Sequence, residues 1–376
     1  MPRETILTTA VARIARLPFW LFDKRPLVTP KKILILKPCC LSQVMLATPL
    51  LAALARAYPD AQIDWAVSDW ARPAIAGNPR LTELIRTGSE DLRRSNWKEI
   101  RQLVSRLRQE KYDTCIVPSR SGILSLIAWW AGIPQRIGLN IGGRGFAHNF
   151  AVKPQQTAWH EALIYLSLAG AMAIDTEADE ALLMEFYPSD LSRTAVTELL
   201  IDELDWLGDS PLVIMHPGGG QNPVASDTTK RWPVERFVRL GNHLSRQYEA
   251  RTLIIGSQAD YEMAEAIRGM MISPAVNWAG RLSLDEVGAL GEVADLYVGN
   301  DAGPTHISAA VGCPTLAIFG PSNPAISGPF ATKARVITLW HDLEDQPFSW
   351  DTGVTVAEAV EAADSLLQRE PQTNTG

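Results

Sequence analysis

Short apolar runs alternate with longer stretches of helical periodicity along most of this chain. The run Lys32–Leu36 (KILIL) predicts a buried parallel strand, and apolar residues at helical spacing predict a helix over Val44–Tyr58. Ile63–Val67 and Tyr112–Val117 predict further strands. A strand, a helix and a strand in this order form a βαβ unit, which implies a right-handed crossover and a parallel sheet.

The same order of elements begins again after about Leu200. A strand over Leu212–Met215 runs into the glycine-rich turn His216–Gly220, and strands and helices then alternate as far as Phe319. The expected strands lie at 251–255, 276–278, 296–298 and 315–319, and the expected helices at 232–248, 260–271, 303–311 and 356–367, with another helix opened by a capping box at Ser283. We therefore expect an α/β protein with two parallel sheets.

The predicted organisation has four parts, which are an N-terminal amphipathic arm (1–30), a first α/β domain (31–190), a second (205–350) and a C-terminal helix (355–368). An acidic helix over Leu191–Leu204 is expected to link the two sheets. Parallel sheets bind ligands beyond the carboxyl ends of their strands. We therefore expect a cleft surrounded by residues 37–43, 216–231, 256–260, 280–282 and 300–306.

Charge and cysteine content exclude some classes of protein. The net charge of -7 disfavours nucleic-acid binding, because such domains are usually basic. The cysteines are too few and too scattered for a disulfide framework, and adjacent Cys39 and Cys40, which lack C-x-x-C spacing, are expected only to pack a loop. A reducing cytoplasm fits this pattern. Charges of both signs over Arg93–Lys111 indicate the solvated face of a helix.

The N-terminal segment Ile6–Phe22 combines arginines with apolar residues. It is too short to span a bilayer, which takes about 20 apolar residues, and it lacks the features of a signal peptide. One interpretation is an interfacial helix on an anionic leaflet, with Phe19, Trp20 and Phe22 as anchors. The other is an arm that packs on the first domain.

The segment Val298–His306 (VGNDAGPTH) contains a strand end, a turn and a helix start. The first N–H groups of a helix have no partner inside it, and the helix dipole is positive there, so both favour a phosphate. Asp301 stands where an N-cap residue is expected. The alternative is purely structural, with Asp301 as a cap and His306 packed inside the fold.

A second signal runs from the glycines of His216–Gly220 to Lys230 and Arg231. Glycines after a strand let backbone N–H groups approach an anion closely, and the two cations add charge toward a diphosphate. Glycine loops also simply turn corners. The loop, the cations and the helix start in combination favour an anion site.

These segments carry a family resemblance. The pattern HPG…KRWP…GNDAGPTHISAAVGCPTLAIFGPSNP resembles glycosyltransferase family 9, the heptosyltransferases of lipopolysaccharide core assembly, and the opening KILILKPCCLSQVMLATPLLAALARAYPDAQIDWAV is similar to that family's first segment. The resemblance covers Lys31–Leu367. It implies a GT-B fold with two Rossmann-like domains, a last helix that crosses back to the first domain, and inverting, metal-independent transfer without a cofactor.

The resemblance also implies the substrates. The donor is a nucleoside-diphosphate sugar, typically ADP-heptose, bound by the second domain. The acceptor is a lipid-linked sugar or another surface glycan or glycolipid, bound by the first domain. Such an enzyme works in the cytoplasm, at the inner face of the cytoplasmic membrane when the acceptor is a lipid.

Carried over by position, the donor-binding roles fall on the second half of the chain. Lys230 would contact the diphosphate or the departing sugar, Asp301 would hold the donor sugar, and Ala302 and Gly303 would present backbone N–H groups to phosphate. Asp260 would take the ribose hydroxyls, the Leu282 backbone would meet the adenine edge, and Ser226 would lie beside the phosphate. The full set of implied donor-binding residues is Gly218, Gly219, Ser226, Lys230, Asp260, Leu282, Asp301, Ala302, Gly303 and His306.

The first loop departs from the family pattern. The family has Gly-Asp-Val with the aspartate as general base, whereas this chain has Ser42-Gln43-Val44, and a glutamine cannot accept a proton at neutral pH. Three interpretations stay open: another base such as Asp69 or, less well placed, His160; a chain that binds nucleotide sugar without efficient transfer; or a different alignment of this loop. A sugar-nucleotide epimerase of GT-B type is a further alternative.

Overall fold

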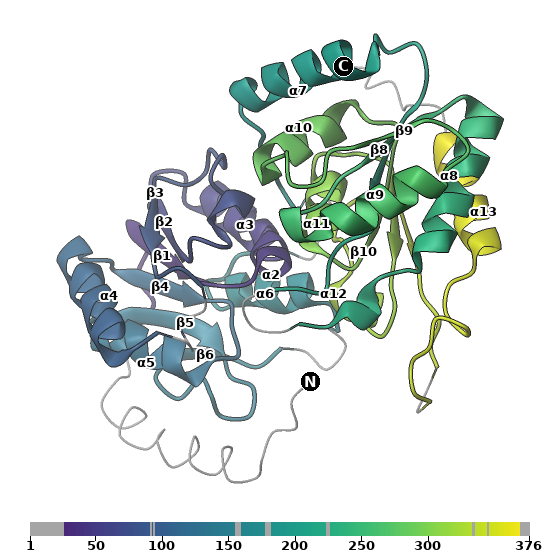
Figure 1. Cartoon of the computed structure of the whole chain (residues 1–376). Coiled ribbons are helices and arrows are strands. Elements are labelled where there is room, and N and C mark those ends of the chain that lie inside the picture. The colour runs from purple at the N-terminus through teal and green to yellow at the C-terminus, as the bar shows by residue number, and fades with distance from the viewer. Residues whose placement is uncertain are drawn as a thin grey trace. The chain divides into compact units, whose positions relative to one another are not determined.

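The structure is a computed structural model that describes residues 26–368 except 91, 93–94, 155–158, 177–181, 223–225, 333–334 and 344–345. The chain divides into two compact units, Met1–Leu182 and Leu183–Gly376. Each unit contains one six-stranded parallel sheet (Figure 1). The predicted α/β class with two parallel sheets is confirmed. The predicted membrane segment, residues 6–22, lies outside the described residues.

The sheet of the first unit has the strand order β3-β2-β1-β4-β5-β6. Its strands are β1 (Lys32–Leu36), β2 (Gln62–Val67), β3 (Glu83–Arg86), β4 (Thr114–Val117), β5 (Gln135–Leu139) and β6 (Phe150–Val152). The central strands β1 and β4 are almost entirely buried, as their unbroken apolar runs predict for a sheet covered on both faces. Strands β3, β5 and β6 were not predicted.

Helices of the first unit follow its strands. They are α2 (Leu41–Met45), α3 (Thr48–Ala57), η1 (Arg72–Ala74), α4 (Trp97–Glu110), α5 (Gly122–Trp130) and α6 (Glu161–Gly170). The helix predicted over Val44–Tyr58 is confirmed as α3, while Val44 and Met45 belong to the separate short helix α2. Pro49 lies in the first turn of α3, where its missing N–H costs no hydrogen bond, and the Thr48 hydroxyl donates to the carbonyl of Met45 at 2.8 Å.

The sheet of the second unit has the order β12-β11-β10-β7-β8-β9. Its strands are β7 (Leu212–His216), β8 (Arg251–Ile254), β9 (Ala275–Asn277), β10 (Leu296–Asn300), β11 (Thr315–Ile318) and β12 (Val336–Leu339). Its helices are α7 (Asp190–Leu204), η3 (Thr228–Lys230), α8 (Val234–Tyr248), η4 (Gln258–Asp260), α9 (Tyr261–Met270), α10 (Leu284–Val293), α11 (Gly303–Ala310), α12 (Pro324–Ser327) and α13 (Val356–Leu367). The predicted strands and helices are confirmed within a few residues, and β12 was missed.

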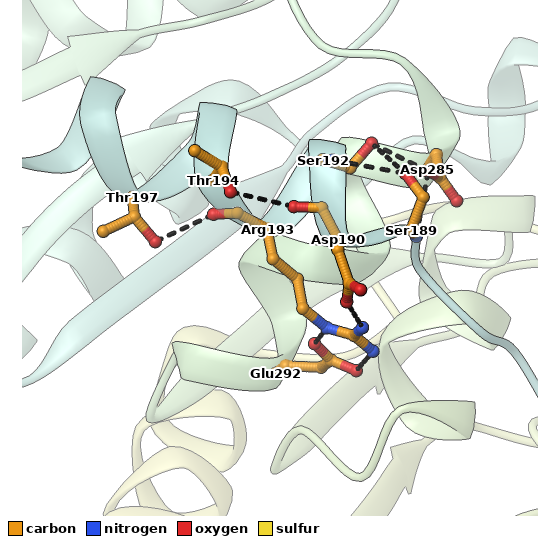
Figure 2. Close-up of polar contacts among 8 residues, drawn as sticks. All are labelled: Ser189, Asp190, Ser192, Arg193, Thr194, Thr197, Asp285 and Glu292. Carbon is orange, nitrogen blue, oxygen red and sulfur yellow. Dashed lines mark hydrogen bonds and ion pairs between the residues drawn. The ribbon is translucent and has the colours of Figure 1, made fainter.

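Helix α7, predicted as a link between the sheets, packs on α10 within the second unit. Asp285 of α10 accepts hydrogen bonds from the backbone N–H and hydroxyl of Ser189 and from the Ser192 hydroxyl (Figure 2). Arg193 forms two hydrogen bonds with the Glu292 carboxylate, at 2.7 and 2.8 Å. Although burial opposes it, the bonds from the serines lower the pKa of Asp285, so α7 is held by a charged acceptor at neutral pH.

Helix α13, predicted to cross back to the first domain, packs against α8 and strands β10 to β12 of the second unit. Its buried face, which includes Ala359 and Ala363, joins the apolar core beside Phe237 of α8. A second core on the other face of the sheet contains Leu200 of α7 and Leu290 of α10. The second sheet is therefore covered on both faces. In the described part of the chain, no helix combines the length and apolarity needed to cross a membrane.

The order of strands reverses once in each sheet. In the first unit the reversal lies between β1 and β4, and in the second between β7 and β10. Connections leave neighbouring strands in opposite directions at such a point, so a crevice opens beyond the carboxyl ends of the two strands. These two places are where a ligand site is expected.

Candidate functional site

One buried side chain joins the segments that surround the β7–β10 reversal. Asn300, the last residue of β10, is fully buried. Its amide NH₂ donates to the carbonyls of Pro217 and Gly218 at 2.8 and 3.0 Å, and its amide oxygen accepts from the Trp232 N–H at 3.0 Å. The loop after β7, the end of β10 and the start of α8 are therefore fixed by one amide.

The glycine loop after β7 has no room for side chains. A Cβ on Gly218 would lie 2.6 Å from a carboxylate oxygen of Asp260, and one on Gly220 would lie 2.0 Å from the carbonyl of Asp227. Gly219 and Gly220 also have φ values of 114° and 75°, which residues with a Cβ rarely adopt. Only glycines therefore fit in this loop, whose backbone packs directly against Asp260 and Asp227.

The prediction that Asp301 caps α11 is wrong. The N-cap residue is Ala302, which makes no side-chain cap hydrogen bond. The Asp301 carboxylate instead pairs with the Lys230 ammonium, at 2.5 Å. The helix begins with Gly303 and Pro304 and therefore starts without a side-chain cap.

Arg231 and Asp260 also contact the glycine loop. Arg231 donates to the Gly219 carbonyl at 3.0 Å and to the Asp260 carboxylate at 3.1 Å. Asp260 also accepts from the backbone N–H and the hydroxyl of Ser257. Beside them, burial lowers the pKa of His216 to about 4, against the raising effect of Asp260, so its imidazole is neutral at pH 7.

The remaining predicted donor residues occupy different environments. Leu282 is half-buried and lies just after Gly280, whose N–H donates to the Gly256 carbonyl beyond β8. Ser226 is exposed and forms an isolated antiparallel bridge with Gln221. His306 is buried inside α11 and only 1% exposed. The structure thus brings Gly218, Gly219, Lys230, Asp260, Asp301, Ala302 and Gly303 together around the β7–β10 reversal.

A second polar cluster lies at the β1–β4 reversal of the first unit. The Lys37 ammonium is buried, donates to the Tyr165 hydroxyl at 2.8 Å and lies 3.4 Å from the amide oxygen of Gln43. The Tyr165 hydroxyl also donates to this oxygen. Because a lysine only donates, the oxygen of Gln43 must face Lys37 and its NH₂ must face away. Gln43 is therefore held as a hydrogen-bond donor.

Glu161, at the start of α6, places a carboxylate in this cluster. One carboxylate oxygen pairs with the Arg120 guanidinium at 2.5 Å. The other is buried and has no hydrogen-bond partner among the residues described. Burial, followed by the charge of the Glu161 carboxylate, raises the pKa of the Tyr165 hydroxyl above its ordinary value.

The two bases considered from the sequence are both engaged. Asp69, after β2, forms two hydrogen bonds with the Arg86 side chain, at 2.9 and 2.8 Å. The His160 ring nitrogen accepts from the Ala162 N–H and so caps α6. Neither contact points to proton transfer.

Two further findings concern cysteines and metals. The expectation that Cys39 and Cys40 only pack the loop is wrong, because their sulfur atoms form a disulfide between adjacent residues. Cys115 and Cys313 are free and buried. Within the ranges that the structure covers, no group of three or more histidine, cysteine, aspartate or glutamate side chains is placed to hold a metal ion.

Four residues of these clusters were not singled out from the sequence: Asn300, Arg120, Glu161 and Tyr165. Asn300 stands in the quoted motif, but an asparagine at a strand end is not by itself a signal. Arg120, Glu161 and Tyr165 lie at least 77 positions after Gln43 in the sequence and share no motif with it. The topology supplies the missing signal, because residues at the start of α6 and after β4 lie at the same edge of the sheet.

Comparison with known proteins gives a consistent set of relatives. Residues 100–349 match the family described as glycosyltransferase family 9 (heptosyltransferase). Lipopolysaccharide heptosyltransferase 2 of Salmonella typhimurium is 29% identical over 320 residues, which cover 82% of this chain and 88% of that protein. These matches span both units.

Two solved structures are similar along the whole fold. The ADP-heptose heptosyltransferase II of E. coli aligns with a TM-score of 0.72 and 25% identity, over 89% of this chain and 98% of that one. A family 9 glycosyltransferase from Veillonella parvula aligns with a TM-score of 0.75 and 21% identity, over 90% and 97%. The latter likeness concerns the fold alone.

Replacing the buried amide of Asn300 tests whether it holds the site together. In Asn300→Asp, a carboxylate would face the carbonyls of Pro217 and Gly218, so two hydrogen bonds are lost and a charge is buried. We expect the free energy of unfolding to fall by about 2 to 4 kcal/mol, as measured by urea denaturation.

Asn96→Asp is the matched control. Asn96 caps α4, and aspartate caps a helix about as well, so this variant should stay within about 0.5 kcal/mol of wild type. Equal stability of the two variants would show that Asn300 does not organise the loops.

Proposed function

Because this chain belongs to glycosyltransferase family 9 and is thus a glycosyltransferase, we propose that it transfers a heptose-like sugar from a nucleoside-diphosphate donor. ADP-heptose is the favoured donor, since relatives are named lipopolysaccharide and ADP-heptose heptosyltransferases. The proposed acceptor is a lipopolysaccharide-type glycan or another surface glycolipid. The proposed reaction inverts the anomeric centre, needs no metal or cofactor, and takes place in the cytoplasm at the inner face of the cytoplasmic membrane.

The observation that carries this proposal is the group of donors at the β7–β10 reversal. The Lys230 ammonium, the N-terminus of α11 at Ala302 and Gly303, and the backbone of the glycine loop all lie there. When an acceptor hydroxyl attacks the anomeric carbon, the carbon–oxygen bond to the diphosphate breaks and negative charge develops on the leaving group. Fixed N–H groups and an ammonium stabilise that charge without reorganisation.

Other donor contacts follow as parts of the proposal. Asp301 orients Lys230 through their ion pair and has a second oxygen for the donor sugar. Asp260 binds the ribose hydroxyls, the Leu282 backbone contacts the adenine edge, and Ser226 lies beside the phosphate. His306 is buried, so its proposed role is to support the first turn of α11 from within the helix.

The acceptor hydroxyl must lose a proton, and Gln43 cannot take it. We propose Glu161 as the proton acceptor, because it lies in the cluster of Tyr165 and Gln43 and one of its carboxylate oxygens has no hydrogen-bond partner among the described residues. Asp69 stays the competing candidate, although Arg86 engages both of its oxygens. Gln43 would then bind the acceptor through its outward NH₂.

The alternative is a family member that binds nucleotide sugar without efficient transfer. The observation that favours it is the orientation of Gln43, whose oxygen is committed to Lys37 and Tyr165. Calorimetry would then show donor binding while no product forms. An epimerase of GT-B type would instead isomerise the donor in the absence of any acceptor.

Release of nucleoside diphosphate from a panel of nucleotide sugars tests the transferase proposal. With acceptor present, we expect ADP release from an ADP-sugar, and Lys230→Gln should lower kcat about 100- to 1000-fold because one charge-stabilising donor is lost. Arg246→Gln removes the same charge at an exposed position of α8 and should leave kcat unchanged. Neither turnover nor slow donor hydrolysis across the panel would contradict the proposal.

Glu161→Gln and Asp69→Asn, compared side by side, identify the base. General-base catalysis is worth about 100- to 10,000-fold, so Glu161→Gln should lower kcat by at least about 100-fold without changing donor binding. If Asp69→Asn shows these effects instead, the assignment to Glu161 is wrong.

A further inference from the structure

Tryptophans and unpaired cations share one surface of the first unit. Trp97 at the start of α4 is 61% exposed, and its ring lies 5.5 Å from the ring of Trp130 in α5. The residues that line a shallow hollow between the two helices include Trp97, Lys98, Arg101, Val104, Arg108 and Trp130. These six residues are called the Trp–Arg surface below.

The helical spacing collects the cations of α4 beside the tryptophans. Trp97, Arg101, Val104 and Arg108 are separated by four, three and four positions, so they form one stripe along α4. Arg108 donates two hydrogen bonds to the Trp130 carbonyl, which holds its guanidinium at the hollow. Positive charge and indole rings are thus presented together.

The acidic residues of α4 lie elsewhere on the helix. Glu99 closes the capping box with Asn96, and Glu110 pairs with Lys32 at 2.8 Å. The remaining arginine, Arg106, pairs with Glu83. Within the part of the chain that is described, Lys98, Arg101 and Arg108 form no ion pair, so their charge is uncompensated on a protein whose net charge is -7. The expectation of a merely solvated helix face does not account for the tryptophans beside them.

We propose that the Trp–Arg surface docks on a membrane with anionic phospholipid headgroups. Indole rings favour the boundary between headgroups and acyl chains, where the apolar ring is covered and the N–H stays wet. Lysine and arginine near an anionic leaflet each add about 1 kcal/mol of attraction. An acidic protein needs such a local cationic surface, because its overall charge repels the same leaflet. The inference rests on the proposed function only in giving the docking a purpose, which is access to a lipid-linked acceptor.

Vesicle sedimentation of the full chain tests this docking without donor or acceptor, so its result is independent of the transferase proposal. Wild type should partition onto vesicles that contain phosphatidylglycerol and much less onto pure phosphatidylcholine, and added salt should weaken the binding. Arg101→Gln should lower the partition coefficient about fivefold. Trp97→Ser should lower it about tenfold, because an apolar anchor is lost.

Arg239→Gln, the same charge change at an exposed position of α8, should leave partitioning unchanged. Residues 1–25 are present in every variant, so any membrane contact of theirs cancels in the comparison. Melting temperatures confirm that each variant is folded. Equal partitioning of Arg101→Gln and Arg239→Gln would overturn the proposal. So would a loss of self-association in Trp97→Ser without any vesicle binding, which would assign the surface to a second copy of the chain.

Discussion

The buried amide of Asn300 is the interaction on which the second unit's site depends. It has one donor group and one acceptor group, and the structure uses both, so that the glycine loop, the end of β10 and Trp232 hold fixed positions. Each of those segments carries a group that faces the β7–β10 reversal. Lys230 lies two positions before Trp232, and Asp301 follows Asn300 directly. The ion pair between Lys230 and Asp301 is therefore a consequence of where Asn300 places the backbone.

The candidate sites of the two units are built from different kinds of group. In the second unit, backbone N–H groups and the Lys230 ammonium are suited to a diphosphate, and the strand reversal together with the Asn300 amide holds them in place. In the first unit the polar cluster at the β1–β4 reversal holds the Gln43 amide, which cannot accept a proton at neutral pH. There the chemistry depends on side chains from several elements, Lys37, Arg120, Glu161 and Tyr165.

Much of the fold was predictable because the buried strands of a parallel sheet are unbroken apolar runs in the sequence. Unbroken apolar runs predicted β1 and β7, and the glycine turn and helix start predicted most of the residues that meet at the β7–β10 reversal. Strand β5 was missed because Gln135 and Arg136 look exposed in the sequence, yet both are buried. The Gln135 amide accepts a hydrogen bond from the Val28 N–H and donates one to the Val28 carbonyl. The Arg136 guanidinium donates to the carbonyls of Ile133 and Ala147. Such partners, like those of Asn300 and Glu161, are set by tertiary contacts and leave no local pattern.

Under the proposed function, the β7–β10 reversal of the second unit binds the donor's diphosphate. Amide hydrogen exchange with and without ADP tests it most directly, because backbone N–H groups are the proposed ligands. At saturating ADP we expect slower exchange of the backbone amides of residues 218–220, 301–303 and 305, and a smaller effect in Asn300→Asp. Slowed exchange confined to other segments, or none at all despite bound ADP, would contradict it.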